Sequence, residues 1–254
     1  MRQRIAVISD IHSNLEALEA VLAEIDRLGC QEIICLGDLV GYGPDPEASV
    51  DLVMERCGVV LRGNHDDALF RPVLDFNPIA RNAINYTRKI MKPGLVRAGR
   101  KAKRWEFLRH LPLQQLRGDW LLVHASPNDP LKEYLLKTDL LFCRDKIAEA
   151  LERTPRLAFV GHTHFPGVFD EKLRFHEPRD LRDGQYRFGD GKAIINVGSV
   201  GQPRDKDPRA CFVTVEADGA RFHRVEYDFT AVQQKILASG PFDEFSAARL
   251  ARGE

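Results

Sequence analysis

The stretch Ile5-Ala6-Val7-Ile8-Ser9-Asp10-Ile11-His12 places an aspartate and a histidine directly after a short apolar run. An apolar run of this length followed by polar residues is typical of a buried strand that ends in a loop. Apolar runs also precede four further clusters, namely Gly37-Asp38, Gly63-Asn64-His65-Asp66, His124 and Gly161-His162-Thr163-His164. Side chains that can bind metals or move protons therefore follow five predicted strands.

Helical patterns separate the first of these strands. A stripe of apolar residues at three- and four-residue steps predicts one helix, and it comprises Leu15, Leu18, Leu22, Ile25 and Leu28. We expect Ser13 and Glu16 to form a capping box at its start and Gly29 to end it. Asp45-Pro46 predicts the start of a second helix. Alternating strands and helices predict parallel pairing, and the carboxyl ends of such strands meet at one edge of a sheet, where ligands bind.

Residues 71–118 interrupt this alternation and predict an inserted helical cap. Asn77-Pro78 indicates one helix start, and a second helical pattern around Trp105 and Leu108 ends at Pro112. The segment carries twelve Lys or Arg residues against two acidic ones, a local net charge of +10. This charge would either concentrate an anionic substrate near a cleft or form a solvated face or a contact with another subunit.

Strands resume after the cap, at Trp120–Val123, Leu157–Val160, Ala193–Val197, Cys211–Val215 and Phe222–Tyr227. Asp218-Gly219 predicts a hairpin between the last two. A helix is expected near Thr138–Arg153, between the first two of these strands, and another from Thr230 onward. We predict one domain over residues 1–254, because 254 residues fit one large domain and no low-complexity linker divides the chain.

Composition narrows the class of protein. Hydrophobic residues make up 44% and charged residues 29%, and 37 basic residues balance 37 acidic ones, so net charge gives no sign of a polyanion partner. The apolar run after Met1–Arg4 is too short for a signal peptide, and no run is long enough to span a bilayer. We therefore expect a cytoplasmic protein with no membrane partner. The five cysteines form no CxxC pair and are interpreted as small buried hydrophobes.

The clusters themselves predict a metal site. Imidazole and carboxylate ligands without thiolate suit divalent Mn, Fe, Co, Ni or Zn. Seven potential ligands, counting the amide oxygen of Asn64, are too many for one tetrahedral ion but fit two ions that share a carboxylate. Ions about 3.5–4 Å apart can hold the attacking and leaving oxygens of a displacement at phosphorus, and a bridging water becomes hydroxide near neutral pH. His162 and His164 are two residues apart, so we expect them to point the same way from an extended segment.

The order D-x-H, G-D, G-N-H-D/E, H and G-H-x-H resembles the signature of the calcineurin-like metallophosphoesterase superfamily. The resemblance runs from Ile5 to about Tyr227. It is strongest to the small prokaryotic phosphodiesterases, which share the ending Gly198-Ser199-Val200-Gly201-Gln202-Pro203-Arg204. The resemblance implies an α/β fold, a four-layer αββα sandwich of two mixed β-sheets flanked by helices.

The resemblance also implies a role for each site residue. The first metal would be bound by Asp10, His12 and His164, the second by Asn64, His124 and His162, and Asp38 would bridge the two. His65 would be catalytic, facing the substrate and donating a hydrogen bond or proton. Asp66 would orient this region or only cap its loop. Arg204 would contact the phosphate, or form an ion pair with Asp205 or Asp207 instead.

These roles predict a dinuclear phosphoesterase that hydrolyses a phosphodiester or nucleotide-type ester through a metal-bridging hydroxide. Serine/threonine protein phosphatases of the superfamily carry G-D-x-x-D-R-G, and the sequence Gly37-Asp38-Leu39-Val40-Gly41-Tyr42-Gly43 lacks the second aspartate and the arginine, which disfavours that activity. The superfamily also contains dinucleoside polyphosphate hydrolases, and a non-catalytic scaffold could share the fold.

The expected partner is a small phosphorylated substrate, such as a nucleotide. Long nucleic acids are disfavoured, because the net charge is zero and no aromatic stacking platform is evident. Homo-oligomerisation is left open.

Overall fold

The structure is a computed structural model that describes residues 3–74, 76–94, 98–240, 242 and 244–254. Within these residues the strands form two six-stranded sheets, with the orders β3-β2-β1-β11-β12-β9 and β4-β5-β6-β10-β7-β8. The first sheet comprises β1 (Ile5–Ile8), β2 (Glu32–Cys35), β3 (Val59–Val60), β9 (Gln185–Arg187), β11 (Ala210–Glu216) and β12 (Gly219–Val225). The second comprises β4 (Gln114–Arg117), β5 (Trp120–Val123), β6 (Leu157–Val160), β7 (Gly167–Asp170), β8 (Phe175–His176) and β10 (Ala193–Asn196).

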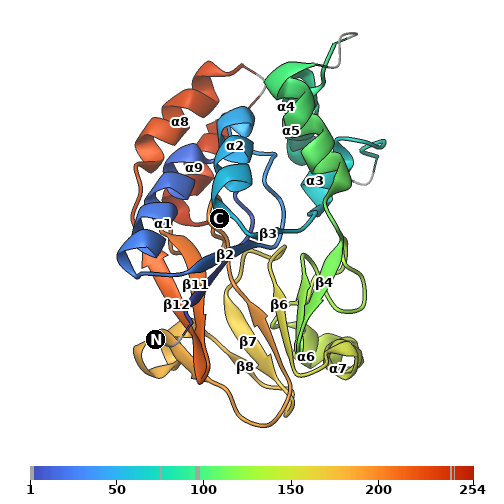
Figure 1. The fold of residues 1–254 in the computed structure, drawn as a ribbon, viewed down its shortest axis with the longest axis vertical. Helices are drawn as coiled ribbons and strands as arrows, with labels where there is room; N and C mark the ends of the chain where they lie inside the picture. The colour runs from blue at the N-terminus through green and yellow to red at the C-terminus, as the bar shows by residue number, and fades with distance from the viewer. Residues whose placement is uncertain (1–2, 75, 95–97, 241, 243) are drawn as a thin grey trace.

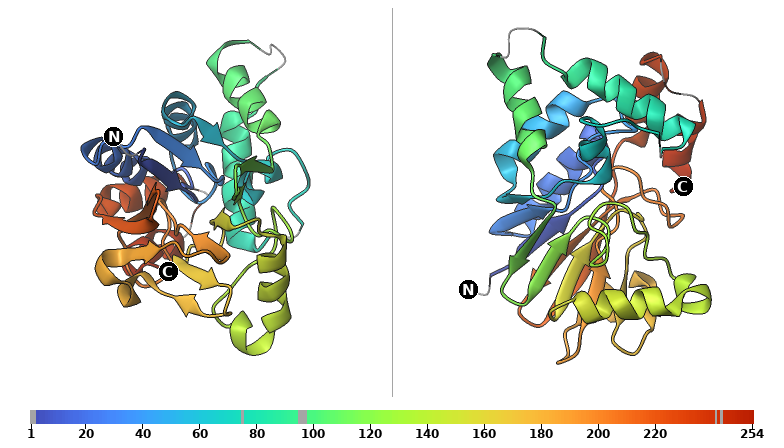
Figure 2. Two further views of the ribbon diagram at one scale, coloured as in Figure 1. Left: turned by 60° about the horizontal axis from the view of Figure 1, so that its bottom comes forward. Right: turned by 90° about the vertical axis from the view of Figure 1, so that its right-hand side faces the viewer.

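Helices cover both outer faces of the paired sheets (Figure 1). They are α1 (Leu15–Arg27), α2 (Pro46–Arg56), α3 (Asn64–Ala68), α4 (Pro78–Met91), α5 (Gly99–His110), α6 (Asp139–Phe142), α7 (Arg144–Arg153), α8 (Phe229–Ala238) and α9 (Glu244–Ala248). Short 3-10 turns occur at η1 (Pro178–Asp180), η2 (Arg182–Gly184) and η3 (Arg249–Arg252). Figure 2 shows α6 and α7 on the far side of the sheets from α1 and α2. The predicted αββα sandwich is therefore confirmed.

Both sheets are mixed, as predicted. β1 pairs in parallel with β2 and antiparallel with β11, while β10 pairs in parallel with β6 and antiparallel with β7. The parallel strands β1, β2 and β3 lie side by side, as do β5, β6 and β10. The loops after these parallel strands, which carry the candidate ligands, therefore meet at one edge of the sandwich.

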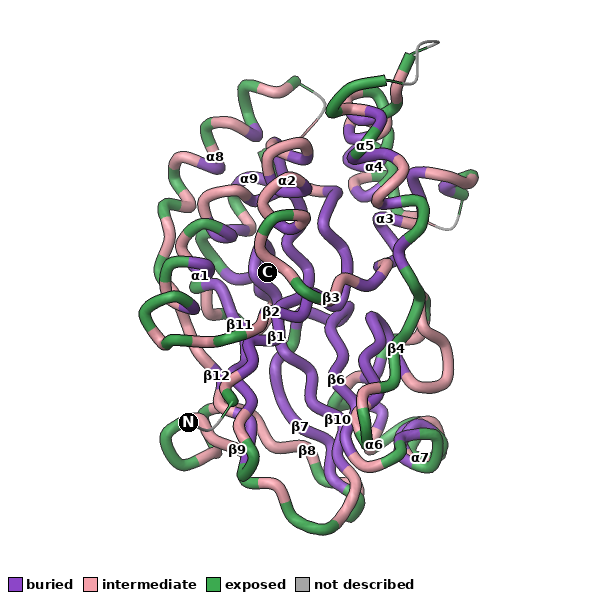
Figure 3. The backbone as a smooth tube through the Cα atoms, in the orientation of Figure 1, coloured by how far each residue is buried: buried purple, intermediate pink, exposed green. Residues whose placement is uncertain are grey.

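Side chains alternate between the two faces of each strand and so contribute to three apolar clusters. On β1, Ile5 and Val7 face the core between the two sheets, where they join Phe159 and Ile195. The intervening residues of β1 face the cluster formed with α1 and α2, and a third cluster lies under α7. Figure 3 shows the resulting continuity of buried residues through the strands. Because both faces of each sheet are covered, the strands have nearly continuous apolar sequences.

Several local predictions need correction. The N-cap of α1 is Asn14, whose side chain accepts from Ala17 N at 3.1 Å, so the capping box predicted at Ser13 and Glu16 is wrong. The helix expected over Thr138–Arg153 is broken at Cys143, whose backbone is not helical (φ −144°, ψ 49°). The short strands β7, β8 and β9 were not predicted, because they carry no clear alternation.

The cysteines fit their predicted role only in part. Cys35 and Cys211 are buried and Cys30 and Cys57 are half-buried, but Cys143 is exposed. All five are free thiols. Among the described residues, no helix combines the length and the apolar character needed to cross a membrane.

The basic segment at 71–118 is helical through α4 and α5, but its last residues, Gln114–Arg117, form β4 at the edge of the second sheet. Asp75 and Arg97 lie outside the described residues. Several of its cations have local partners: Arg71 pairs with Asp67, and Arg88 donates to the main-chain oxygens of Ala68, Leu69 and Arg71. Arg71 therefore has an acidic partner, and Arg88 serves to hold the preceding loop.

Arg104 is the most enclosed of these cations, with a side chain 10% exposed. Its Nε and Nη2 donate to the two carboxylate oxygens of Asp51 at 2.7 and 2.6 Å, and its Nη1 pairs with Glu47. Both acids lie on α2, so this bidentate pair ties α5 to α2. The hydrogen bond from Arg104 lowers the pKa of Asp51.

Replacing Arg104 by alanine is expected to lower the free energy of unfolding by about 1–3 kcal/mol at pH 7, since two carboxylates lose their partner. A carboxyl group whose pKa is lowered in the folded state stabilises the fold at pH values above its ordinary pKa. The difference in free energy of unfolding between wild type and variant should therefore shrink as the pH falls below about 4. Urea unfolding at pH 7 and at about pH 3.5 measures it. Arg100→Ala is the control, because Arg100 is 78% exposed and 3.9 Å from Asp51. Equal stability of the Arg104 and Arg100 variants would contradict the prediction.

Candidate metal centre

The five ligand-bearing loops are joined to one another by hydrogen bonds. Asp10 N donates to Gly37 O at 3.0 Å, and His12 N donates to Asp38 O at 2.9 Å. Gly161 N donates to His124 O at 2.8 Å. Each of these bonds links the loop after one strand to the loop after its neighbour. The fold also joins ligands that are distant in sequence. Asp10 and His162 are 152 residues apart, and His162 N donates to Asp10 Oδ2 at 2.9 Å.

The first group of ligands is Asp10, His12 and His164. His12 Nε2 lies 3.1 Å from His164 Nε2, and Asp10 Oδ1 lies 3.8 Å from the former and 3.2 Å from the latter. The other ring nitrogens lie against carbonyls, His12 Nδ1 on Val40 O at 3.1 Å and His164 Nδ1 on Gln202 O at 2.5 Å. A carbonyl only accepts, so each Nδ1 carries the proton and each Nε2 presents a lone pair.

Two lone pairs and the carboxylate of Asp10 therefore face one another in a buried space. Asp10 Oδ1 is buried and has no hydrogen-bond partner. Three acceptors with no donor between them repel one another, and a buried unpaired carboxylate oxygen is costly. A cation removes both penalties, and carbonyl bonds to the outer nitrogen are the usual way to orient a metal-binding histidine. The donor set and its geometry therefore fit a divalent metal ion.

The second group contains Asp38, Asn64, His124 and His162. His124 Nε2 lies 3.1 Å from Asn64 Oδ1 and 3.5 Å from Asp38 Oδ2. A ligand atom of His162 lies within 4.8 Å of those of Asp38 and His124. All four residues are buried. This group offers two imidazoles, an amide oxygen and a carboxylate oxygen, which again suits a first-row divalent ion.

Asp38 connects the two groups. Its Oδ2 is 3.6 Å from His12 Nε2 on one side and 3.5 Å from His124 Nε2 on the other. Its Oδ1 accepts from His65 N at 2.8 Å. The backbone leaves room for this only because residue 63 is glycine, since a Cβ on Gly63 would collide with the Asp38 carboxylate. Asp38 thus occupies the position expected of a bridging ligand.

His162 and His164 do not point the same way, so that prediction is wrong. His164 belongs to the group with Asp10, and His162 to the group with His124. Their backbone φ angles are 63° and 62°, so the segment is not extended. Left-handed φ values also occur at Asp10, His12 and Asp38. Such strain at five ligand residues is typical of functional sites, where the surrounding fold holds unfavourable backbone in place.

His65 lies beside both groups. Its ring centroid is 4.8 Å from that of His12, and its Nδ1 is buried without a hydrogen-bond partner. Burial lowers the pKa of His65 to about 4. A ring nitrogen of His65 also lies within 4.8 Å of ligand atoms of His12 and Asp38. The geometry thus places His65 at the centre in a position to touch either a cation or a substrate oxygen.

Asp66 supports the loop that carries Asp38. Its Oδ1 accepts from Leu39 N at 3.0 Å and Val40 N at 3.3 Å, and its Oδ2 accepts from Gly63 N at 3.0 Å. Asp66 therefore both orients the region around Asp38 and caps its own loop. Burial, and then the neighbouring Asp38 carboxylate, raise the pKa of Asp66 to about 7.

The other ionisable ligands are shifted by the same two causes. Burial, and then His124, lower the pKa of His162 to about 3. Burial opposes charge on His124 as well, but the carboxylates of Asp38 and Asp10 outweigh it and raise the pKa of His124 to about 9. Burial opposes the charge on Asp10 too, yet His164 holds the pKa of Asp10 well below its usual range. Burial thus favours the neutral imidazole at His162, whereas the nearby carboxylates favour the charged imidazole at His124.

Two supporting residues were not predicted from the sequence. Asn196 donates through Nδ2 to Gly161 O at 2.6 Å and to Thr163 Oγ1 at 2.9 Å, which fixes the loop of His162 and His164. Ser199 donates through Oγ to Asp10 O at 2.9 Å. Ser199 belongs to the ending 198–204 quoted for the family resemblance but had no assigned role, and the signal for Asn196 was its place at the end of β10.

Aromatic and guanidinium groups border the metal centre. The Tyr42 ring lies 4.8 Å from His12 and 4.7 Å from His65, and Tyr134 stacks on His162 at 3.9 Å. Arg204 and Arg249 each lie 5.8 Å from the Tyr42 ring centroid. Of these two aromatic and two basic residues, only Arg204 was predicted to border the site.

Arg204 forms no ion pair with Asp205 or Asp207 among the described residues. Asp205 pairs with Arg224, and Asp207 pairs with Arg209 at 2.7 Å. Arg204 instead donates through Nη2 to Gln202 Oε1 at 2.8 Å. It also lines a cleft of about 1000 Å³ together with Phe165, the residue after His164, although none of the candidate ligands lines that cleft. Arg204 therefore borders a cleft that adjoins the loop of His164.

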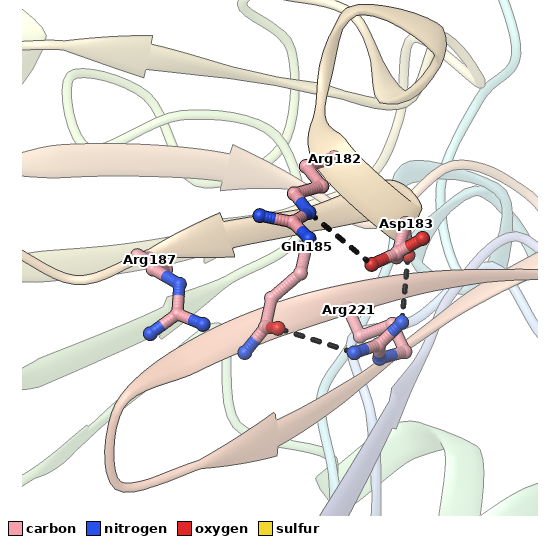
Figure 4. Close-up of a pocket in the computed structure, with 5 residues that line it drawn as sticks. All are labelled: Arg182, Asp183, Gln185, Arg187 and Arg221. Carbon is pink, nitrogen blue, oxygen red and sulfur yellow. Dashed lines mark hydrogen bonds and ion pairs between the residues drawn. The ribbon is translucent and has the colours of Figure 1, made fainter.

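A second hollow, of about 590 Å³, contains none of the ligands (Figure 4). It is lined by Arg182, Asp183, Gln185, Arg187 and Arg221. These residues belong to η2, β9 and β12, and β9 is the edge strand opposite β3 in the first sheet. The Arg182 side chain is 97% exposed, so its charge is solvated. This hollow is not part of the candidate centre.

Paired sheets with buried histidine and carboxylate ligands at their carboxyl edge define a metal-dependent phosphoesterase fold. The model of the calcineurin-like phosphoesterase superfamily domain matches residues 3–219, and the chain belongs to this superfamily. Membership implies hydrolysis of phosphate esters with divalent metal ions. The predicted family is therefore confirmed.

Individual relatives agree with this assignment. The chain is 37% identical over 248 residues to the uncharacterized protein MJ0912 of Methanocaldococcus jannaschii, a match that covers 93% of each chain. It is similar to a metallophosphoesterase from Sphaerobacter thermophilus, with 37% identity, a TM-score of 0.84 and 100% coverage of both chains. The hypothetical protein PH1004 from Pyrococcus horikoshii shares the fold, at 19% identity and a TM-score of 0.73 over 99% and 98% of the two chains.

Proposed function

We propose that the chain is a dinuclear metal-dependent hydrolase of phosphodiesters or nucleotide-type phosphate esters. The proposal is carried by one observation, the two buried groups of potential metal ligands that share Asp38. The predicted ligands would be divided as Asp10, His12 and His164 around one ion and Asn64, His124 and His162 around the other, with Mn, Fe, Co, Ni and Zn all suited to this donor set. When bound, such ions supply Lewis-acid charge to a phosphoryl group and make a water molecule more acidic.

The protein groups around the ions would orient the substrate and move the proton. His65 is held between the rings of Tyr42 and Phe76, at 4.7 and 5.3 Å. A neutral imidazole in this position carries one N–H that can donate to a phosphoryl or leaving oxygen. Asp66 positions the loops on which Asp38 and His65 lie.

The site supports a small ester better than a phosphoprotein. Gly41 and Tyr42 stand where the protein-phosphatase pattern carries aspartate and arginine. The Tyr42 ring packs on His12 and His65 and supplies no positive charge. Residue 41 must also be small, because a Cβ on Gly41 would meet the His65 ring. A non-catalytic scaffold is disfavoured, since all predicted ligands and His65 are present and converge.

The substrate class is tested with metal-loaded protein. Mn²⁺-loaded protein is assayed against phosphomonoesters, cyclic nucleotides, dinucleoside polyphosphates, bis(p-nitrophenyl) phosphate and a phosphopeptide. We expect the highest kcat/KM on a diester or nucleotide, and loss of activity in EDTA that Mn²⁺ restores. Preference for the phosphopeptide, or no turnover of any ester, would contradict the proposal. A cytoplasmic place of action and a small phosphorylated partner belong to the same proposal.

A further inference from the structure

We propose that Arg204 and Arg249 form a second anion-binding subsite beside the metal centre, which takes a second phosphate group of the substrate. This inference rests on the proposed function, because it assigns a phosphate ester with two anionic groups to the same site. Arg249 lies on η3, near the end of the described chain, and Arg204 follows the loop after β10. The two are brought together only by the fold.

The two guanidiniums share one aromatic partner. Each lies 5.8 Å from the centroid of the Tyr42 ring, and that ring in turn contacts His12 and His65. The main chain of Arg204 also donates to His164 O at 3.3 Å. Both cations are therefore one side chain away from the metal ligands. An anion bound by both guanidiniums would lie on the Tyr42 side of the ligands, and we assign it to a second phosphate group of the substrate.

Neither cation has a carboxylate side chain as partner among the described residues. Arg204 donates to an amide oxygen of Gln202 and its Nε is buried without a partner. Arg249 donates through Nε to the main-chain oxygen of Glu254 at 2.6 Å. Burial, and then the repulsion from Arg204, lower the pKa of Arg249 to about 10. Two neighbouring like charges, offset only in part by Glu254 near Arg249, are an unfavourable arrangement that a phosphate dianion would relieve.

Other arginine clusters of the described chain differ in this respect. The hollow of Figure 4 also gathers arginines, but Arg221 already donates to Asp183 O and Gln185 Oε1, and Arg182 is in solvent. Arg204 also lines a cleft of about 1000 Å³ together with Phe165 and Pro166, whereas Arg249, Tyr42 and the candidate ligands do not line it. This cleft gives room for the organic group of a substrate beyond Arg204.

The test compares adenosine 3′,5′-bisphosphate with adenosine 5′-monophosphate on Mn²⁺-loaded protein. Dissociation constants come from isothermal titration calorimetry, and inhibition constants from the hydrolysis of bis(p-nitrophenyl) phosphate. We expect the wild type to prefer the bisphosphate and Arg249→Ala to reduce this preference about tenfold, the loss of one charge-assisted contact. Arg249→Lys, which keeps the charge, should retain part of the preference and shows that an effect does not come from misfolding.

The matched control is Arg252→Ala, three residues further along η3. Arg252 lies over Phe245 at 5.9 Å and pairs with Glu254 at 3.0 Å, and it has no contact with Tyr42. Its replacement should leave the preference unchanged. Equal weakening of both nucleotides by Arg249→Ala, or no weakening, would overturn the subsite. A wild type that binds the bisphosphate preferentially but hydrolyses no diester would refute the proposed function and leave the subsite standing.

Discussion

Replacement of Asp38 by asparagine is expected to lower the bound metal from two ions per chain to one or none and to reduce diester hydrolysis by about 10²–10³-fold or more. Asp38 Oδ2 is within 3.6 Å of a histidine nitrogen of both ligand groups. Asparagine has the same size and keeps an oxygen for the bond from His65 N, so the backbone should be preserved. The neutral amide, however, cannot balance the charge of two cations.

Metal content by plasma mass spectrometry and kcat on bis(p-nitrophenyl) phosphate measure this effect. Asp26→Asn is the matched control, because the Asp26 side chain is 61% exposed and pairs with Arg56, outside the ligand groups. The control should retain two ions and full activity. An Asp38→Asn protein that still holds two ions and turns over normally would show that Asp38 does not bridge.

Replacement of His65 by alanine is expected to lower kcat by about 10²–10⁴-fold while metal content stays unchanged. His65 is a buried histidine at the centre to which neither ion was assigned, and its ring is held by Tyr42 and Phe76 instead of by a carbonyl. The same two measurements apply. His110→Ala is the control, because the His110 side chain is 74% exposed on α5.

The two readouts separate two roles for His65. Loss of activity with both ions retained indicates contact with the substrate. Loss of an ion would instead assign His65 as a ligand together with His12 and Asp38, an arrangement that the distances also allow. Unchanged activity would show that His65 takes no part in the reaction.

The ligands could be predicted from the sequence because each stands directly after an apolar run. Parallel strands carry the loops that follow them to one edge of a sheet. Asp10 and Asp38 were therefore predictable as neighbours from β1 and β2, whereas β5, which carries His124, lies in the second sheet, and only the packing of the two sheets brings His124 to them. Their division between two metal ions came from the family resemblance and stays a prediction.

Predictions failed where the backbone departs from regular structure. The expectation for His162 and His164 assumed an extended segment, but left-handed φ values turn the two rings into different groups. Ser13 also has a left-handed backbone, with φ 55°, and the N-cap falls on Asn14 instead. Single residues in strained conformations leave no periodic pattern in a sequence, so such turns could not be anticipated.

The residues that border the site were missed for a different reason. Tyr42, Tyr134 and Arg249 are single side chains from three distant segments, with no motif around them. Within the basic segment 71–118, Arg104 and Arg88 join helices and loops. The expected role of this segment in concentrating an anionic substrate stays a prediction. Only the three-dimensional structure shows that Arg249 shares the Tyr42 ring with the predicted Arg204.

The most direct test of the dinuclear centre is an anomalous-scattering map at the manganese edge from crystals of the Mn²⁺-loaded protein. We predict two peaks about 3.5–4 Å apart on either side of Asp38, one against Asp10, His12 and His164 and the other against Asn64, His124 and His162. A single peak, or peaks that do not lie at Asp38, would contradict the dinuclear assignment.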